Sequence, residues 1–292
     1  MNAEHLEQLR NWIGKTESSR DVVAPAAIAR LSAVLDYCEP RVLVGDALPP
    51  AWHWLFFLPA PAASVLGSDG HPRRGDFLPP ITLPRRMWAG SDMRFLQRVE
   101  VGDEIRRESE IADVIAKQGR SGGLVFVHVM HKVYRGEQLA IEETQNIVYR
   151  DGVDGAPAQA KEETSAQTRK KPLAQAQWSR TIEPDNVLLF RYSALTFNSH
   201  RIHYDWRYAV EEEGYDDLVV QGPLTAILLL DLLHREIPAA QLESFSFRGV
   251  KPLLAGRTLQ LQGRRDDQLV SLWALDAAGA LAMEARAQLS GG

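Results

Sequence analysis

The sequence predicts an α+β fold built from two related modules, each with helices first and antiparallel strands after them. Strand-like segments follow one another in residues 93–149, and a second series follows a long apolar helix at 222–236. Successive strands joined by short turns form antiparallel meanders rather than βαβ units. A stretch of small, polar and charged residues without aromatics, 151–172, separates the two series.

The first module begins with two predicted helices, at 3–16 and 24–38. In the second helix, apolar residues fall mostly on one face, and Pro25 stands where a first-turn proline is tolerated. An aromatic run at 52–58 follows. The many Pro and Gly residues of 59–92 predict an irregular excursion over a surface or an active site.

Four strands are expected next, because β-branched and aromatic residues alternate with turn signals. The turns are predicted at Gly102-Asp103, between Gly119 and Gly123, and at Gly136-Glu137. The corresponding strands are 93–100, 103–116, 123–135 and 138–149.

The stretch 151–172 has the composition of a linker. We therefore expect an N-terminal module at 1–150 and a C-terminal module at 173–292. The second module opens with a strand-like stretch and a polar segment, and the apolar helix comes next. Four further strands are predicted near 242–250, 257–264, 269–276 and 279–288.

The helix at 222–236 is apolar on nearly every side, so it must be buried on every side. Strands follow it, which indicates a curved sheet wrapped around a helix. Its first turn presents free N–H groups and the positive end of the helix dipole. Gly222 and Leu224 are the candidate donors, because Pro223 has no N–H. The feature is either a plain helix start or a place where a carbonyl oxygen is polarised.

The segment 190–205 is unusually dense in polar residues, and three interpretations are open. In the first, His203 is a general acid or base and Asn198 positions a water or a substrate group. In the second, His200, His203 and Asp205 bind a metal, as in a catalytic zinc site. In the third, the histidines are hydrogen-bonded near a domain surface and have no chemical role.

Composition excludes several classes of protein. The net charge of −5 and the pI of about 5.9 disfavour a general nucleic-acid binder. The longest apolar stretches are too short for a transmembrane helix, so no membrane partner is expected. Cys38 is the single cysteine, which excludes an intrachain disulfide and a thiolate-rich metal site. The first 15 residues lack the pattern of a secretory or transit peptide, so we expect a cytoplasmic protein.

Four segments carry a resemblance to a known family: YSALTFNSHRIHYD at 192–205, LVVQGPL at 218–224, LPRRMWAGS at 83–91 and KQGRSGGLVFV at 117–127. The chain resembles the MaoC-like (R)-specific enoyl-CoA hydratases. It is most similar to their branch of itaconyl-CoA and mesaconyl-C4-CoA hydratases and 3-hydroxyacyl-thioester dehydratases. The resemblance covers nearly the whole chain. It implies a double hot-dog fold, in which each of two antiparallel sheets wraps around a helix.

His203 matches the catalytic histidine of this family. The chain departs from the family pattern at three positions. Asn198 stands where an aspartate is expected, His200 where an asparagine is usual, and Gln221 where many relatives have a histidine. The resemblance favours the acid–base interpretation of His203 over the metal and the purely structural one.

The implied reaction is reversible addition of water across the double bond of an α,β-unsaturated acyl-CoA. His203 would deprotonate the water, Asn198 would hold it, and the Gly222 N–H would stabilise the thioester enolate. No metal and no cofactor are expected, because the thioester already acidifies Cα and CoA is part of the substrate. The first module would be a scaffold without a catalytic motif, and its excursion at 59–92 would cover the acyl pocket.

The substrate contacts expected from the resemblance include cations for the CoA phosphates and one more for a dicarboxylic acyl group such as itaconyl. The candidates are Arg85, Arg86, Arg201, Arg248 and Lys251, together with the uncharged or weakly basic His200, Gln221 and Leu224. Hot-dog sheets often pair, so a homo-oligomer is compatible with the resemblance.

Four other functions stay open at this point. A dehydratase of acyl-carrier-protein thioesters uses the same chemistry in reverse. A non-catalytic acyl-thioester binding module would explain the missing aspartate. A thioesterase is a third option, because one fold hosts several reactions. A metal hydrolase would lose its activity with a chelator.

Overall fold

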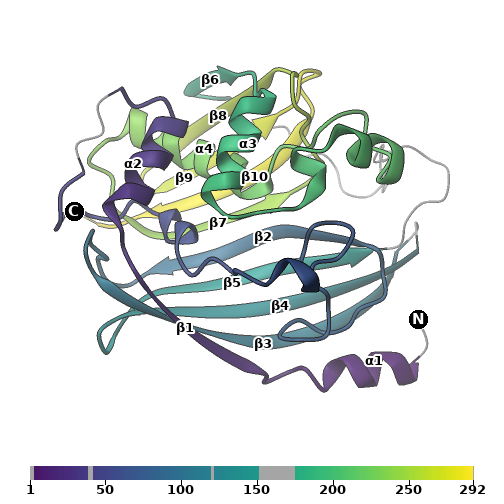
Figure 1. Cartoon of the computed structure of the whole chain (residues 1–292). Coiled ribbons are helices and arrows are strands. Elements are labelled where there is room, and N and C mark those ends of the chain that lie inside the picture. Colours follow the sequence, from purple (N-terminus) through teal and green to yellow (C-terminus); the bar gives the residue numbers. More distant parts are fainter. Residues whose placement is uncertain (1–2, 39–41, 120–121, 151–174, 292) are drawn as a thin grey trace.

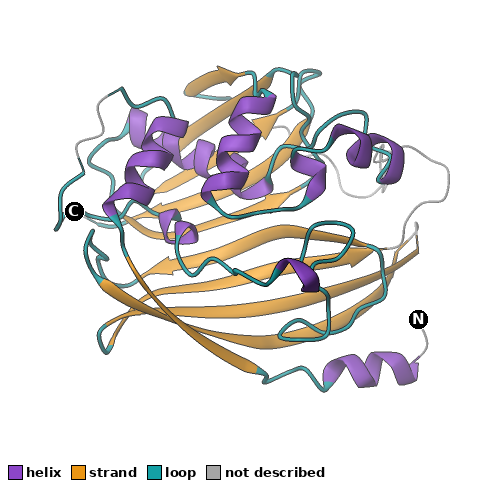
Figure 2. Cartoon of the chain, viewed as in Figure 1, coloured by secondary structure: helices purple, strands orange, loops and turns teal. Residues whose placement is uncertain are grey.

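The structure, a computed structural model, describes residues 3–38, 42–119, 122–150 and 175–291. The strands of these residues form one antiparallel sheet in the order β1-β3-β4-β5-β2-β7-β10-β9-β8-β6. β2 (Arg85–Phe95) pairs with β7 (Leu242–Gly249) and so joins the N-terminal half of the sheet to the C-terminal half. Most of the helices lie against the C-terminal half (Figures 1 and 2). The α+β class with antiparallel strands is as predicted.

The N-terminal half contains helices and strands that match the prediction in order but not at every boundary. Its elements are α1 (Ala3–Arg10), β1 (Thr16–Val22), α2 (Pro25–Val34), the 3-10 helices η1 (Trp52–Leu55) and η2 (Ala63–Val65), β2, β3 (Glu104–Gly119), β4 (Gly122–Arg135) and β5 (Gln138–Arg150). The helix predicted at 3–16 ends at Arg10, and the strand β1 was not predicted. β1 is an edge strand that pairs only with β3, so it stays largely exposed and polar in sequence.

The first predicted strand, at 93–100, was placed too late in the chain. β2 begins at Arg85, inside the stretch predicted to be irregular, and ends at Phe95. The sequence did not predict the first part of this strand because it contains Gly90, and glycine normally weakens the interior of a strand. Here it accompanies a shift of register between Trp88 and Gly90. A Cβ at Gly90 would lie 2.3 Å from the carbonyl oxygen of Phe247, so the close approach of β7 requires glycine.

The C-terminal half follows the prediction more closely. Its elements are β6 (Trp178–Ile182), α3 (Asn186–Leu195), the 3-10 helix η3 (Arg201–His203), the π-helical turn η4 (Tyr208–Glu212), α4 (Gly222–Glu236), β7, β8 (Leu259–Asp266), β9 (Leu269–Leu275) and β10 (Leu281–Leu289). The helix at 222–236 has the predicted bounds and is buried continuously from Leu224 to Leu233. It packs against β6, β8, β9 and β10, so this half of the sheet wraps around it.

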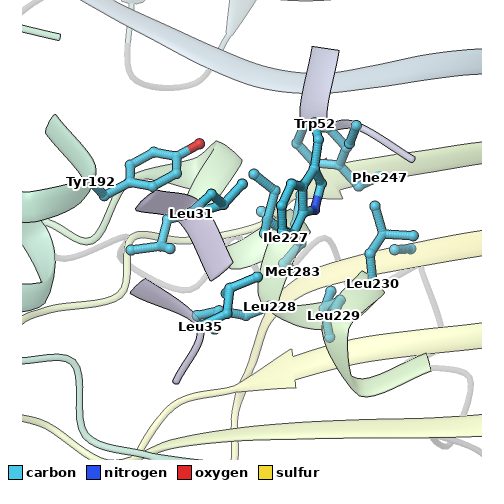
Figure 3. Packing of buried hydrophobic residues seen from close by; sticks show 14 of the residues in the cluster. Leu31, Leu35, Trp52, Tyr192, Ile227, Leu228, Leu229, Leu230, Phe247 and Met283 are labelled. Atoms are coloured by element: carbon cyan, nitrogen blue, oxygen red, sulfur yellow. The ribbon is translucent and has the colours of Figure 1, made fainter. Parts of the chain in front are cut away.

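The largest core cluster surrounds α4 (Figure 3). Leu31 and Leu35, from α2 and its C-cap, meet Tyr192 of α3 and the apolar side chains of α4 there. The N-terminal half has no helix as long as α4 among the described residues. A second cluster covers part of its inner face instead, with Leu9 of α1 and Ile81 packed on valines of β4.

The predicted linker, 151–172, lies outside the described residues, so the division into modules 1–150 and 173–292 stays a prediction. Within the described part of the chain, none of the helices has the length and apolar character needed to cross a membrane.

Candidate active site

A cavity of about 1220 Å³ is lined by residues from both halves of the sheet. Apolar and aromatic side chains make up much of its wall: Trp54, Phe56, Phe57, Phe77, Trp88, Phe190 and Phe197. Residues of the excursion at 59–92 form part of this wall, as expected of a segment that covers a pocket. Seven of the predicted site residues also line it: His203, Asn198, Gly222, His200, Gln221, Arg86 and Lys251.

His203 lies at the end of η3, only 7% exposed, with its ring held in one orientation. Its Nδ1 lies 2.7 Å from the carbonyl oxygen of Val219. A carbonyl only accepts, so Nδ1 carries the proton and Nε2 is left as the basic atom. Burial lowers the pKa of His203 to about 4, against the opposing hydrogen bond to Val219. The ring is therefore a neutral base at physiological pH.

This pKa predicts the acid side of the pH–rate profile. Hydration requires neutral His203, and the neutral form persists as pH falls until it reaches the pKa of about 4. We expect kcat to be independent of this group above about pH 5 and to fall to about half near pH 4, where half of the rings are protonated. Initial rates between pH 3.5 and 8, with stability monitored in parallel, measure it. An acid limb near the unperturbed value of about 6.5 would contradict this environment for the ring.

His200 lies beside His203, with 5.4 Å between the ring centroids. Burial, together with the neighbouring His71 and His203, lowers its pKa to about 2. Its side chain makes no hydrogen bond to any described residue, so both ring nitrogens face neighbours or the cavity unpaired. His200 is therefore neutral at physiological pH.

Asn198 shapes the turn that precedes His200. Its Oδ1 accepts a hydrogen bond from the His200 N–H at 3.1 Å, and its own N–H donates to the carbonyl of Ser193 at 2.8 Å. Phe197 just before it has a φ of 49°, in the left-handed region that non-glycine residues seldom adopt. The amide NH₂ is the group left for a ligand. An amide holds a water but does not exchange protons as a carboxylate does.

The start of α4 meets the cavity at Gly222. The N–H groups of Gly222 and Leu224 have no acceptor among the described residues, and Pro223 has no N–H. The Leu224 side chain is fully buried in the core, so its backbone amide is the group available to a ligand, as the sequence predicted for a donor at this position. Unpaired amides at the positive end of a buried helix stabilise negative charge on an oxygen.

Gln221, the N-cap of α4, is tied to α3 rather than free to bind a ligand. Its Nε2 donates to the Leu189 carbonyl and to Ser193 Oγ, both at 2.9 Å. Its Oε1 is buried without a partner in the described chain. The side chain thereby fixes the start of α4 relative to α3, although it also forms part of the cavity wall.

A loop from the N-terminal half brings two groups that sequence reasoning missed. His71 lies with its ring centroid 4.2 Å from that of His200, and Asp69 lies beside His71. The three residues present ligand-type atoms within 4.8 Å of one another. The metal site considered from the sequence, with His200, His203 and Asp205 as ligands, is not formed. Asp205 pairs with Arg201 instead of approaching the two histidines. The only signal for His71 was its place in the predicted excursion.

A second polar cluster lines the cavity on the inner face of the N-terminal half. Glu143 of β5, only 2% exposed, accepts from Ser91 Oγ at 2.7 Å and from the Trp54 indole, and lies 2.9 Å from His53 Nε2. Burial opposes ionisation of Glu143, but His53 and the other donors prevail and lower its pKa to about 2. This carboxylate is fully satisfied, which indicates a structural role between β5 and the aromatic run.

The basic residues predicted to bind substrate differ in whether they reach the cavity and in which carboxylate they pair with. Arg201 pairs with Asp205 at 2.8 Å and Arg248 with Glu284 at 2.7 Å. Arg85 is buried against Glu213. None of the three reaches the cavity wall, because each guanidinium is held by a carboxylate elsewhere. Lys251 lines the cavity and pairs with Asp276.

Arg86 differs from these cations. It lines the cavity and has no carboxylate partner among the described residues. Its charge lies close enough to His71 and His200 to contribute to lowering the pKa of both rings.

Comparison with known proteins shows the family of the chain. The family model described as hydroxyacyl-thioester dehydratase type 2 matches residues 51–255. The chain is 44% identical over 280 residues to a protein named mesaconyl-C(4)-CoA hydratase from Chloroflexus aurantiacus, covering 96% of this chain and 97% of that one.

Two solved structures from Mycobacterium tuberculosis are similar to the chain in fold. HtdX superimposes with a TM-score of 0.66 at 18% identity, covering 94% of this chain and all of that one. A conserved hypothetical protein described as having a double hotdog fold gives a TM-score of 0.52 at 15% identity, with 95% and 96% covered. The predicted double hot-dog architecture is thereby confirmed.

Proposed function

Because the chain belongs to the hydroxyacyl-thioester dehydratase type 2 family, we propose that its cavity catalyses reversible hydration of a short dicarboxylic α,β-unsaturated acyl-CoA. The chain is an enzyme of the acyl-thioester hydratase and dehydratase class. The observation that carries the proposal is the neutral His203, whose protonated Nδ1 is bound to Val219 while unpaired amides lie at the start of α4.

The mechanism follows from these groups. The thioester carbonyl binds at the Gly222 N–H, where charge that develops on the oxygen is stabilised. His203 Nε2 takes a proton from a water as its oxygen attacks Cβ, and the Asn198 amide holds that water. The electron pair of the double bond moves toward the carbonyl and forms an enolate. Protonation at Cα then completes the 3-hydroxyacyl product.

Arg86 supports the dicarboxylic substrate class. It is a half-buried cation in the wall of the cavity without a carboxylate partner in the described chain. A guanidinium binds a carboxylate through two parallel hydrogen bonds. The relative from Chloroflexus aurantiacus is named for a substrate with a free carboxylate, mesaconyl-C(4)-CoA. We therefore place the distal carboxylate of the substrate at Arg86.

The experiment follows hydration of itaconyl-CoA, mesaconyl-C4-CoA and crotonyl-CoA by mass, with free thiol measured in parallel. We expect hydration of a dicarboxylic thioester without thiol release. Arg86→Met should lower kcat/KM for that substrate by about 10- to 100-fold, the worth of a charged hydrogen-bonded pair, and should affect crotonyl-CoA turnover far less. Arg248→Met, at a surface ion pair, is the matched control and should change neither.

Three results would contradict this proposal. Hydration of crotonyl-CoA alone would favour a dehydratase of fatty-acid metabolism, which the name of the family supports as the second candidate. Thiol release would favour a thioesterase. Binding without turnover of any thioester would favour a non-catalytic module.

The remaining expectations from the sequence stay predictions. They are a reaction without metal or cofactor, the use of CoA rather than a carrier protein, a role in itaconate degradation, a cytoplasmic location and homo-oligomer formation.

A further inference from the structure

We propose that Asp69 and His71 form a second acid–base pair of this active site and deliver the proton to Cα during hydration. The inference rests on the proposed hydration. It assigns a catalytic role to a loop of the N-terminal half, outside the segment that carries the motif. It also accounts for Asn198, because the acid–base chemistry that an amide lacks would be supplied by this pair.

Asp69 holds the His71 ring as a carboxylate holds a catalytic histidine. Its Oδ2 lies 3.3 Å from His71 Nδ1, and its Oδ1 accepts from the His71 backbone N–H at 2.9 Å. The side chain of His71 is 19% exposed and lines the cavity. A carboxylate on Nδ1 leaves Nε2 to exchange protons with a substrate and favours the imidazolium form.

The loop is docked onto the segment that carries His200 and His203. Arg201 donates through its N–H to the Asp69 carbonyl at 3.0 Å and through Nη1 to the Ser68 carbonyl at 2.9 Å. Ser199 Oγ donates to the Gly70 carbonyl at 2.5 Å. Thus Arg201, predicted to bind substrate, instead fixes the position of the second pair.

Gly70 shows how closely the loop is seated. Its φ of 87° lies in the left-handed region, and a Cβ there would lie 1.8 Å from the Ser199 carbonyl oxygen. That oxygen is backbone, so it moves only with the whole turn. Any side chain at this position would push the loop, and His71 with it, away from His200.

His200 is a close neighbour of both acid–base groups. Its ring centroid is 4.2 Å from that of His71 and 5.4 Å from that of His203. All three rings line the cavity, and both ring nitrogens of His200 lack a hydrogen-bond partner in the described chain. A neutral imidazole both accepts and donates a proton, so His200 is placed to relay one between the others.

The proton balance of the reaction closes with these groups. His203 gains the proton of the attacking water as the C–O bond forms at Cβ. The imidazolium of His71 loses its proton as the C–H bond forms at Cα from the enolate pair. One proton then passes from His203 to His71, through His200 or solvent, and both groups return to their starting states. Dehydration runs through the same steps in reverse.

The charged groups around His71 come from several elements. Burial, Arg86 of β2 and Arg74 of the same excursion outweigh Asp69 and hold the pKa of His71 below its usual value, so the imidazolium that donates to Cα is populated mainly at mildly acidic pH. His200 faces the ring, and His203 lies beyond it. Replacing Asp69 by asparagine removes the one group that stabilises the imidazolium. The alkaline limb of kcat for hydration, where His71 loses its proton, should therefore move to lower pH.

A metal site is the competing interpretation of Asp69, His71 and His200. A metal would have to bind His71 Nδ1 or Nε2, and the first of these already faces Asp69 Oδ2 at hydrogen-bond distance. Both oxygens of Asp69 are engaged by His71 itself. A proton between Oδ2 and Nδ1 explains this geometry, and a shared ion does not.

The test compares kcat of His71→Ala and Asp69→Asn with that of the wild-type enzyme at a saturating concentration of one thioester substrate. We expect His71→Ala to lower kcat by about 10²-fold or more with an unchanged melting temperature, and added imidazole to restore part of the rate. Asp69→Asn should lower kcat less and shift the alkaline limb downward. Gly70→Ala should lower kcat, whereas Gly279→Ala, at a similar φ of 75° with no atom within 4 Å, should not.

The outcomes separate the two proposals. Wild-type turnover together with a His71→Ala rate within threefold of it would overturn the second pair and leave the proposed function in place. Activity lost with a chelator and restored by Zn²⁺ would overturn it in favour of a metal site. A wild-type protein that hydrates none of the thioesters would remove the proposed function and this inference together.

Discussion

Replacing His203 with alanine is expected to lower kcat for hydration by about 10²- to 10⁴-fold, the usual contribution of a general base. The ring is buried and neutral, and its only hydrogen bond in the described chain uses Nδ1 on the Val219 carbonyl. Nε2 is therefore the basic atom of this ring, because the Val219 carbonyl keeps the proton on Nδ1. KM should change little, because the variant loses an interaction made in the transition state.

His203→Asn separates chemistry from structure in the same experiment. An asparagine side chain still donates a hydrogen bond toward the Val219 carbonyl, but it has no basic nitrogen. We expect this variant to match the alanine variant in kcat while it unfolds at the wild-type temperature. Near wild-type turnover by His203→Asn would mean that the ring only anchors η3 to the strand-like segment before α4, and would remove it from the mechanism.

The part of the site that lies on one continuous run was predictable from the sequence. His200, His203 and Asn198 come together because the turn after α3 and the short helix η3 are local structures. The helix α4 was predictable for a different reason, since a segment apolar on every side has few alternatives to burial. The strands after α4 were predictable from the alternation of apolar and polar residues and from turn residues, and both of these signals are also local.

The elements that were missed depend on distant contacts. Asp69 and His71 reach His200 only through the docking of their loop on Ser199 and Arg201, more than a hundred residues away. The φ of Gly70 and its contact with Ser199 have no signal in the local sequence beyond the glycine itself. Asp185 is the N-cap of α3, and its side chain accepts from the Leu188 N–H; that N-cap was the available local signal for the helix.

The arginines were the weakest part of the sequence reasoning, for an electrostatic reason. A cation far from any carboxylate in the sequence is often beside one in the fold, as Arg248 is beside Glu284 on the neighbouring strand β10. Arg201 has its partner one helical turn away, at Asp205. Only the fold shows that Arg86 keeps an unpaired charge in the cavity wall.

Replacing Asp231 with alanine is expected to lower the free energy of unfolding by about 3–5 kcal/mol, as when one partner of a buried ion pair is removed. Asp231 lies in α4 with its side chain 1% exposed. It accepts from Tyr37 Oη at 2.6 Å and from Arg235 Nε at 2.9 Å, and it pairs with Arg180 of β6. Burial and this carboxylate raise the pKa of Tyr37 to about 12.

Two controls define what the measurement means. Asp231→Asn keeps an acceptor for Tyr37 and loses the charge, so its loss of stability should be intermediate. Arg248→Ala breaks an exposed pair and should cost about 1 kcal/mol or less. Denaturant unfolding measures the free energy of unfolding of all three variants. A decrease of less than about 1 kcal/mol for Asp231→Ala would contradict a role of Asp231 in anchoring α4.

The same variant also tests how α4 serves the site. Asp231 is nine residues after Gly222, about 14 Å along the helix axis, so it touches none of the groups that bind the thioester. At a temperature where the variant is folded, kcat should therefore stay near the wild-type value. Asp231 holds the far end of the helix against β6 and Tyr37, and the buried helix in turn holds the Gly222 amide in the cavity. Stability and catalysis would then separate along one helix, with the anchor at one end and the substrate carbonyl at the other.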